Sequence, residues 1–533
     1  MSKKHTNTTF GIDKTDSSDI KYTRIYFDLF KNDSRSLSEA QYNDLNLEEL
    51  FNYLNRCITP VGEMLLYYKL RHIAKSNINA REKIVTQIEE DDNFREGIED
   101  ALSDLANDSE CSTSSLLNLH ISLSKWHRYF KFLPIAYLVL ISIVWLFASQ
   151  MTLLIVGLFI VLLNTFIHYW NKSYVETYIR PLGQLNRIRT TAIKLIKIDQ
   201  SNRLEDIHKS IDEISGLRKK VGIFNLNSLM ESDFALVLTL AIDILKTISL
   251  IEPITTNAIL TKISNIKFHT KTLIDYLGEW DVLYSIASLR VWMKHNNSEW
   301  SIPSFTASNC SLTATEMYHP LIADCVCNSI TIDKSVIITG SNMSGKSSFL
   351  KTIGVNIVAA YAINTCFAEK IVLPNCCLHT VLSVSDDINN AQSYYYSEAQ
   401  RIKSIIDKCN EAPLGCTNIV LVDEIFKGTN TIERLSIANA VIQYFTKLNN
   451  TIVIISTHDI ELARSFKDVL STYHFSETVN QTGLRFNYKL ILGVEYTRNA
   501  ISILKSCNYP EEIISCAELN TQKICKSMDT IIL

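Results

Sequence analysis

The chain lacks several features that would place it in common protein classes. None of its 13 cysteines belongs to a C-x-x-C pair, so we expect neither a zinc site nor a disulfide framework, and the sequence favours a reducing cytosol. The polar N-terminus has no apolar stretch of the kind that a signal peptide needs. A net charge of −4 gives no overall basic surface, which argues against a strong nonspecific nucleic-acid binder.

Charge is also missing from one long internal stretch, because no Asp, Glu, Lys or Arg occurs from Phe132 to Trp170. Its length suits two membrane spans of about 17–20 residues each, Phe132–Ala148 and Met151–Trp170, joined by Ser149-Gln150. Basic and aromatic residues flank the stretch on both sides. We therefore expect a multi-pass protein of the cell membrane with both chain ends in the cytoplasm. The alternative is a helical hairpin buried in a soluble core.

The rest of the chain divides into a helical part and an α/β part. Its 533 residues exceed one ordinary core, and apolar residues recur at helical spacing on both sides of the uncharged stretch. After a polar, turn-rich segment at 294–311, strand-like runs alternate with helical ones, which predicts a largely parallel sheet. The expected divisions are a polar leader at 1–46, a discontinuous α-helical core and lever-like domain at 47–126 and 173–300, two transmembrane helices at 127–172, and an α/β domain at 301–533.

The α/β part contains a phosphate-binding pattern. Apolar residues 336–338 lead into residues 340–347, which follow G-x-x-x-x-G-K-[ST], and a helical run comes next. Such a loop turns backbone N–H groups inward around phosphate oxygens at the positive end of a helix. We expect an ATP site in which Lys346 contacts the β- and γ-phosphates and Ser347 ligates Mg²⁺. The predicted nucleotide-binding residues of the loop are Gly340, Ser341, Asn342, Met343, Ser344, Gly345, Lys346, Ser347 and Ser348.

Two later strand-like runs also end in polar residues. The run 418–422 ends in Asp423 and Glu424, and the run 451–456 leads to His458. Parallel strands would bring these ends together beside the phosphate loop. Asp423 would then hold Mg²⁺, Glu424 would polarise the attacking water, and His458 would sense the γ-phosphate. The alternatives are solvated carboxylates and a structural histidine.

Together these segments resemble the MutS family of DNA mismatch-repair ATPases. The motifs that carry the resemblance are the phosphate loop, the Asp-Glu strand end, an S-D-D segment, the start of a signature helix and a T-H pair. In this chain they stand at Thr339–Ser347, Asp423–Thr431, Ser385–Ile388, Ser393–Glu398 and Thr457-His458. The helical half is similar more thinly, at Thr59–Leu66 and Glu279–Ser285.

The resemblance implies an ATPase that works as a homodimer. Ser393 of one subunit would contact the γ-phosphate bound by the other, and Thr429–Thr431 would cross the interface. The segment 499–517 is similar to the helical element by which MutS subunits hold one another. Val326 would stand at the base-stacking position, where mismatch-repair members carry an aromatic residue, so adenine would pack on aliphatic surface.

The chain departs from the family pattern in ways that leave the phosphate and magnesium ligands intact, so hydrolysis is still expected. The substituted positions are Ser341 for Pro, Phe426 for Gly, Lys427 for Arg, Asn430 for Ser and Arg434 for Gly. We find no segment that matches the family's mismatch-reading domain. The apolar hairpin stands where the family carries a DNA clamp at the tips of its levers.

The expected fold is an α/β P-loop ATPase domain of the MutS type at the C-terminus, preceded by an all-α core and lever-like domain with an inserted transmembrane helical hairpin. The leading hypothesis is a membrane-anchored homodimeric ATPase whose ATP-driven lever motion acts on the membrane or on a membrane-bound partner. DNA binding is implied by the resemblance alone. The alternative is a soluble DNA-binding repair factor that uses basic residues such as Arg218–Lys220 and buries the hairpin. A third hypothesis is a structural dimer with a decayed ATPase.

Overall fold

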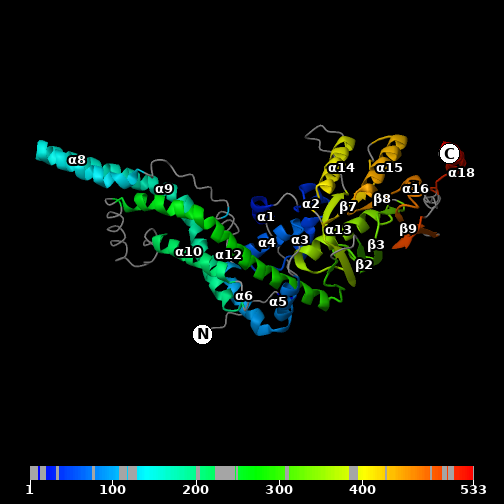
Figure 1. Ribbon diagram of the computed structural model, residues 1–533, viewed down its shortest axis with the longest axis horizontal. Coiled ribbons are helices and arrows are strands. Elements are labelled where there is room, and N and C mark those ends of the chain that lie inside the picture. Colours follow the sequence, from blue (N-terminus) through cyan, green and yellow to red (C-terminus); the bar gives the residue numbers. More distant parts are fainter. Residues whose placement is uncertain are drawn as a thin grey trace.

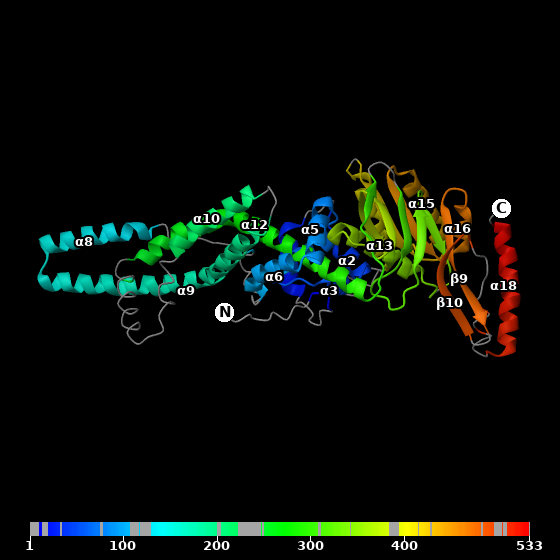
Figure 2. The ribbon, with the colours of Figure 1, turned by 90° about the horizontal axis from the view of Figure 1, so that it is seen from below.

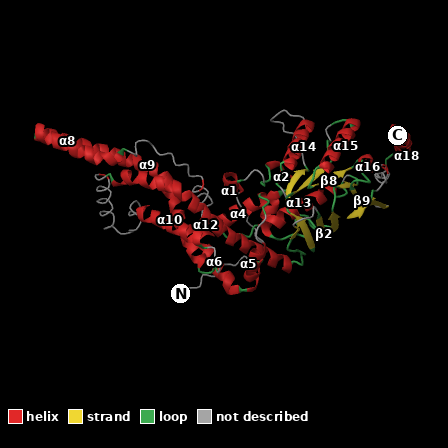
Figure 3. Cartoon of the chain, viewed as in Figure 1, coloured by secondary structure: helices red, strands yellow, loops and turns green. Residues whose placement is uncertain are grey.

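The computed structural model is an elongated molecule with a helical hairpin at one end and β-sheets near the other (Figure 1). Helices make up the hairpin end and strands gather at the opposite end (Figure 3). The structure describes residues 10–12, 20–31, 35–74, 78–106, 117, 129–199, 204–221, 247, 250–306, 311–341, 343–382, 394–413, 415–426, 429–480, 483–494, 501, 504 and 509–531.

The helical part is organised around one long helix, α12 (Ile251–His295), which has 45 residues and is therefore about 67 Å long. Helices from both sides of the uncharged stretch pack against it, as expected for a discontinuous domain. The helices before the stretch are α1 (Ile20–Phe30), α2 (Glu39–Asp44), α3 (Leu47–Leu54), α4 (Pro60–Arg71), α5 (Ile78–Glu90) and α6 (Asp92–Ala106), and α10 (Glu205–Val221) follows it. Between α3 and α4 the helical structure is interrupted, and α4 begins at Pro60 with Thr59 as its N-cap.

The buried carboxylate of Asp281, in α12, holds the start of α4 through hydrogen bonds. Asp281 accepts hydrogen bonds from the backbone N–H groups of Ile58 and Thr59, both at 2.8 Å, and from the Thr59 hydroxyl at 2.6 Å. These bonds satisfy donors that a helix start would otherwise leave unpaired. Gly62 lies against the same carboxylate, since a Cβ built there would be 2.2 Å from Asp281 Oδ2. The two helical segments that resemble the MutS family only weakly, Thr59–Leu66 and Glu279–Ser285, therefore pack directly against each other.

Replacing Gly62 with Ala is expected to destabilise the protein by about 1–3 kcal/mol, because the added methyl group has to displace Asp281 from its three donors. Chemical denaturation of the purified protein measures the change. Gly216→Ala in α10 is the matched control, since a Cβ there meets nothing within 4 Å. The control should be neutral or slightly more stable, as alanine favours helix. Equal midpoints for the two variants would contradict the close packing.

The expected polar leader at 1–46 is wrong as a separate segment, because α1 and α2 lie within it and join the core. Tyr26 and Phe27 of α1 are buried, and the Arg71 guanidinium of α4 lies 4.2 Å from the Phe27 ring centroid. The same guanidinium donates to Leu37 O at 3.2 Å. The cation–π contact and the hydrogen bond offset part of the free-energy cost of burying the charged Arg71 side chain, and they hold residues of the leader against α4.

Six strands form the larger sheet, in the order β10-β9-β4-β8-β7-β6. The predicted parallel arrangement is confirmed for β4, β8, β7 and β6, and only β10 runs antiparallel to its neighbour. The strands are β4 (Val336–Thr339), β6 (Cys376–Val381), β7 (Thr417–Asp423), β8 (Thr451–Thr457), β9 (Ser471–Asn480) and β10 (Gly483–Leu492). A smaller sheet, in the order β1-β5-β2-β3, contains β1 (Ser304–Thr306), β2 (Leu312–Met317), β3 (Asn328–Ile332) and β5 (Lys370–Pro374).

Helices cover both faces of the larger sheet, which explains its continuous apolar runs. Alternate residues of the central strands enter two different cores. Ile419 and Leu421 join the core with α13 (Lys346–Ile363), whereas Val420 and Val422 join the core with α14 (Tyr394–Asn410), α15 (Thr431–Lys447) and α16 (Ile460–Ser465). The helix α18 (Glu511–Ile531) lies beyond β9 and β10 at the C-terminal end (Figure 2).

The uncharged stretch forms a hairpin that projects from the helical part (Figure 2). After a short 3₁₀ turn, Phe130–Phe132, it consists of α8 (Leu133–Phe147) and the first half of α9 (Gln150–Ile196). By length and composition Phe130–Phe147 and Gln150–Asn171 are each able to cross a membrane, with mean hydropathy 2.2, and only 6% and 17% of these windows are buried. The described residues of this chain therefore do not bury the hairpin in their own core.

The hairpin is continuous with the helical domain. The expected boundary at 172 falls inside α9, which has 47 residues in all and packs against α12 and α6. The two arms are joined by a hydrogen bond from Tyr137 Oη to Asn164 Oδ1, 2.8 Å long. At the base, the rings of Phe130 and Trp170 lie 6.1 Å apart. The hairpin is thus one end of a helix whose other end belongs to the core.

Candidate functional site

Three neighbouring parallel strands bring the predicted site residues to one edge of the sheet. Thr339 at the end of β4 is in register with Thr457 of β8, and Asp423 at the end of β7 is in register with Ser456. The loop after β4, Glu424 after β7 and His458 after β8 therefore lie together, as the sequence predicted. A cavity of about 670 Å³ opens there. Its lining includes Met343, Gly345, Lys346, Ser347, Ser348, Glu424, Val326 and Tyr488.

The phosphate loop ends in the first turn of α13, which begins at Lys346. Gly345 has φ +105°, and a Cβ there would lie 3.2 Å from the Tyr488 ring, so the position requires glycine. Lys346 Nζ donates to the carbonyls of Gly340 and Ser341 at 2.8 and 2.7 Å. The buried Ser344 hydroxyl makes no hydrogen bond to a described residue. Asn342 lies outside the described residues.

The substituted Ser341 has a partner on the neighbouring strand, since its hydroxyl donates to Glu477 of β9. A proline, which the family pattern has here, would lack this donor. The bond attaches the start of the loop to β9, on the opposite side of β4 from the acidic residues. The substitution thus replaces the rigidity of a proline ring with a hydrogen bond.

The two acidic residues are held differently. Asp423 accepts a hydrogen bond from the Ser456 hydroxyl, which fixes one carboxylate oxygen at the strand end. Glu424 has a left-handed backbone, φ +51°, and its N–H donates to Ser456 O at 2.9 Å. The turn at Glu424 directs its side chain into the cavity, where Ser347 also lies. A carboxylate and a hydroxyl at such a place suit Mg²⁺, which is usually bound by one or two carboxylates, phosphate oxygens and water.

His458 lies beside Glu424, with Nδ1 3.5 Å from Glu424 Oε2. Its hydrogen bond to Glu424 raises the pKa of His458, with Asp459 adding to the effect and burial opposing it. The imidazole is therefore biased toward its charged form, which favours contact with an anion. Asp459 is in turn paired with Arg434 of α15, at 2.8 Å. Arg434, which stands where the family pattern has glycine, is thus connected to Glu424 through Asp459 and His458.

The cavity is also lined by an aromatic residue that the sequence analysis missed, Tyr488. Tyr488 lies in a bulge of β10, between Phe486 and Leu490, and has φ +51°. Asn328 bridges the two walls, because its Nδ2 donates to Tyr488 O at 3.0 Å and to Val326 O at 3.1 Å. Val326 lines the same cavity as Tyr488, and its expected role as the base-stacking residue stays a prediction. A strand pattern alone gives no signal for the bulge.

The predicted Ser393 lies outside the described residues, as do 385–388 and Lys427. The described helix α14 begins at Tyr394, and its buried Glu398 accepts a hydrogen bond from the backbone N–H of Phe426. The Phe426 ring lies 5.8 Å from the Tyr395 ring. The substituted phenylalanine thus ties the signature helix to the turn after Glu424. Asn430, another substitution, caps α15 by accepting from Glu433 N at 3.0 Å, as a serine would.

Comparison with known proteins agrees with this geometry. Residues 336–525 match the family described as MutS domain V. The chain is 27% identical over 275 residues to the DNA mismatch repair protein MSH3 of Kluyveromyces lactis, covering 48% of this chain and 26% of that protein. It is 26% identical over 280 residues to the DNA mismatch repair protein MutS of Petrotoga mobilis, covering 50% and 33%.

A third relative, the DNA mismatch repair protein MutS of Chlorobium chlorochromatii, is 30% identical over 254 residues, which cover 45% of this chain and 28% of that protein. The chain therefore spans only about a quarter to a third of the length of these relatives. The matched family segment contains the phosphate loop, Asp423, Glu424 and His458. The C-terminal part of the chain, which follows a helical region, is thus similar to MutS domain V.

Proposed function

We propose that this chain is a membrane-anchored, MutS-like ATPase that binds and hydrolyses ATP with Mg²⁺. One observation carries the proposal: the phosphate loop and Glu424 line a cavity of about 670 Å³ at the carboxyl ends of parallel strands, and Asp423 and His458 lie next to Glu424. Open α/β sheets bind their ligands at this edge. The cavity volume lies within the usual range for small-molecule sites.

We assign three roles to the residues that line the cavity or lie next to it. Backbone N–H groups of the loop and Lys346 hold the phosphates, for which Lys346 exchanges its two carbonyl partners. Ser347 and Asp423 would hold Mg²⁺, which supplies positive charge to the phosphates. Glu424 would accept a proton from the attacking water, and His458, whose pKa is raised by its hydrogen bond to Glu424, would lie on the side of the γ-phosphate. The purine base packs between Val326 and Tyr488.

A homodimer is part of the proposal, because the resemblance to the MutS family implies that the signature segment of a second subunit completes the nucleotide site. Ser393 of the second subunit would close over the nucleotide. The helix α18 supports this arrangement, since Ile513 and Leu519 are 48% and 57% exposed and are available to a second copy. Apolar residues on an exposed helix face commonly mark an association surface.

The membrane part of the proposal rests on the exposed hairpin and its connection to the ATPase domain. At its C-terminal end α12 reaches that domain through Arg290, which donates to Thr365 Oγ1 at 3.0 Å and to Asn364 O at 3.0 Å. These residues directly follow α13, the helix of the phosphate loop. Closing of the nucleotide site would thus move α12 and, through α9, the hairpin.

The ATPase rate, measured alone, with matched duplex, with mismatched duplex and with liposomes, tests the proposal. We expect magnesium-dependent turnover that rises when the protein is inserted into liposomes and is the same with both duplexes. Stimulation by mismatched DNA alone would favour the second candidate, a DNA repair factor, which the names of the relatives support. No turnover in any condition would overturn the ATPase assignment.

A further inference from the structure

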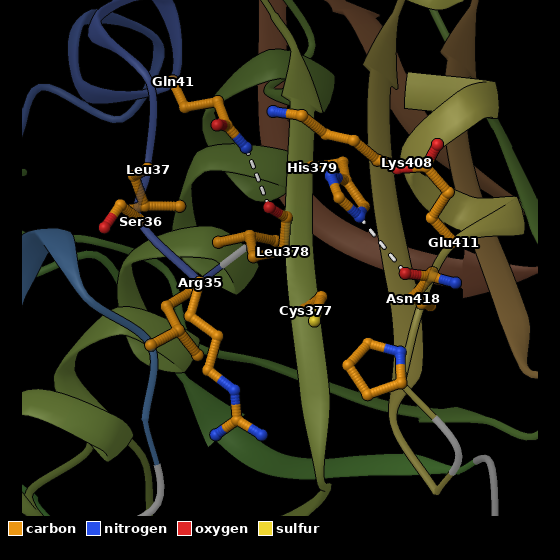
Figure 4. A pocket seen from close by; sticks show the side chains of 13 residues that line it. Arg35, Ser36, Leu37, Gln41, Cys377, Leu378, His379, Lys408, Glu411 and Asn418 are labelled. Carbon is orange, nitrogen blue, oxygen red and sulfur yellow. Dashed lines mark hydrogen bonds between the residues drawn. The ribbon is translucent and has the colours of Figure 1, made fainter. Parts of the chain in front are cut away.

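A second cavity, of about 340 Å³, lies at the opposite edge of the same sheet (Figure 4). It is enclosed by the segment before α2, the first residues of β6 and β7, and the end of α14. None of its lining residues belongs to the nucleotide cavity. It therefore has to be explained separately from ATP binding.

Two cysteine side chains lie close together at this cavity, one from β6 and one from the residue before β7. Cys377 of β6 lines it and is partly exposed, whereas Cys416, just before β7, is buried with 3% exposure. Their sulfur atoms are 3.0 Å apart. A disulfide needs about 2.05 Å, so a shift of about 1 Å completes the bond. Gly415 allows that shift, because it has φ +79° and nothing lies within 4 Å of its Cβ position.

The surroundings favour a thiolate at Cys377. The hydrogen bond with Cys416 lowers the pKa of Cys377 to about 7, burial opposes the change, and the Arg35 guanidinium adds to it. Arg35 and Lys408 both line the cavity (Figure 4). The thiolate is the reactive form of cysteine, and an exposed thiolate beside a buried thiol is the arrangement of an attacking and a resolving cysteine.

We propose that Cys377 and Cys416 form a reversible oxidation site for hydroperoxides. The Cys377 thiolate attacks one peroxide oxygen, the O–O bond breaks, and the other oxygen leaves with a proton as water or alcohol. Cys416 then attacks the sulfur of the resulting sulfenic acid, the S–O bond breaks, and water leaves with the Cys416 proton. Two thiols lose two electrons, and the peroxide gains them. The disulfide joins β6 to the start of β7, the strand that ends at Asp423.

The experiment treats the reduced full-length protein with hydrogen peroxide, blocks remaining thiols and identifies linked peptides by mass spectrometry. Cys376 and Cys409 share the tryptic peptides of the pair, so the reference protein carries Cys376→Ala and Cys409→Ala. We expect a Cys377–Cys416 link that dithiothreitol reverses. Alkylation of Cys377 in the absence of peroxide should be half-maximal near pH 7.

Single variants separate the two roles. Cys416→Ala should stop at a sulfenic acid on Cys377, trapped by dimedone, and should slow alkylation of Cys377 at pH 7 about tenfold, because loss of the hydrogen bond from residue 416 returns the pKa of Cys377 toward that of a free cysteine. Cys377→Ser should leave Cys416 reduced. The exposed Cys516 serves as the internal control for alkylation.

Absence of the link in the reference protein, or equal oxidation of Cys416 in Cys377→Ser, would overturn the proposal. These readouts are chemical and do not involve nucleotide. They therefore remain decisive whether or not the protein hydrolyses ATP.

Discussion

Glu424→Gln is expected to lower the rate of ATP hydrolysis by at least about a hundredfold while leaving ATP binding nearly unchanged. The amide has the shape of the carboxylate but cannot accept a proton from water, and a positioned general base is worth about 10²–10⁴ in rate. Phosphate release measures turnover, and titration with a fluorescent ATP analogue measures binding. With hydrolysis blocked, the closed dimer should accumulate in ATP and be visible as a doubled mass in solution.

Glu369→Gln is the matched control, since Glu369 is an exposed carboxylate before β5 and outside the cavity. It should retain full turnover. A second readout is independent of turnover: the pKa of His458 should fall in Glu424→Gln, because Glu424 is the main cause of its elevation. Unchanged turnover in Glu424→Gln would show that another group activates the water.

Removal of the hairpin is expected to turn a membrane-bound protein into a soluble one. The full chain should remain in the membrane pellet after an alkaline carbonate wash if the hairpin is inserted as proposed, because its two helices have a mean hydropathy of 2.2 and are long enough to cross a bilayer. Replacing 138–163 with a short Gly-Ser turn should release the protein. The Tyr137–Asn164 hydrogen bond marks where the two arms approach closely enough for such a turn.

The shortened protein should fold, since α8 has no buried residue and contributes little to the core. Its far-ultraviolet circular dichroism and its ATPase rate without lipid should match those of the detergent-solubilised full chain. A variant with Leu158→Arg, placed on a side chain that is 63% exposed, should weaken insertion without changing the helix. Release of the unmodified chain by carbonate would remove the membrane anchor from the proposed function.

The sequence alone predicted the parts of the fold in which local pattern and final packing agree. β4, β7 and β8 are short apolar runs that end in polar residues, and their parallel pairing follows from the helices between them. The meeting of the phosphate loop with Asp423, Glu424 and His458 follows from the same rule. The sequence also predicted the hairpin, because helices in the core of a soluble protein rarely contain so long a stretch without charged residues.

Other features depend on contacts between distant residues, which no local pattern contains. The leader reads as polar, yet Tyr26 and Phe27 are buried, because Asp275 of α12 accepts a hydrogen bond from Tyr26 and Arg71 of α4 lies over the Phe27 ring. Tyr488 reads as an ordinary strand residue, and a bulge brings it to the cavity. Gly62 and Asp281 are 219 positions apart by their numbers, and their contact is evident only in the folded chain.

The helix α9 has a mechanical consequence, because it contains Pro181 between its hairpin half and its core half. Proline removes one backbone N–H, so the helix is weakest in bending at this turn. The portion from Gln150 to Arg180 has about 31 residues and is about 46 Å long. A bend of about 10° at Pro181 would therefore move the hairpin tip by about 8 Å, on the order of a quarter of a bilayer core. A small rearrangement at the core end would become a large displacement at the tip.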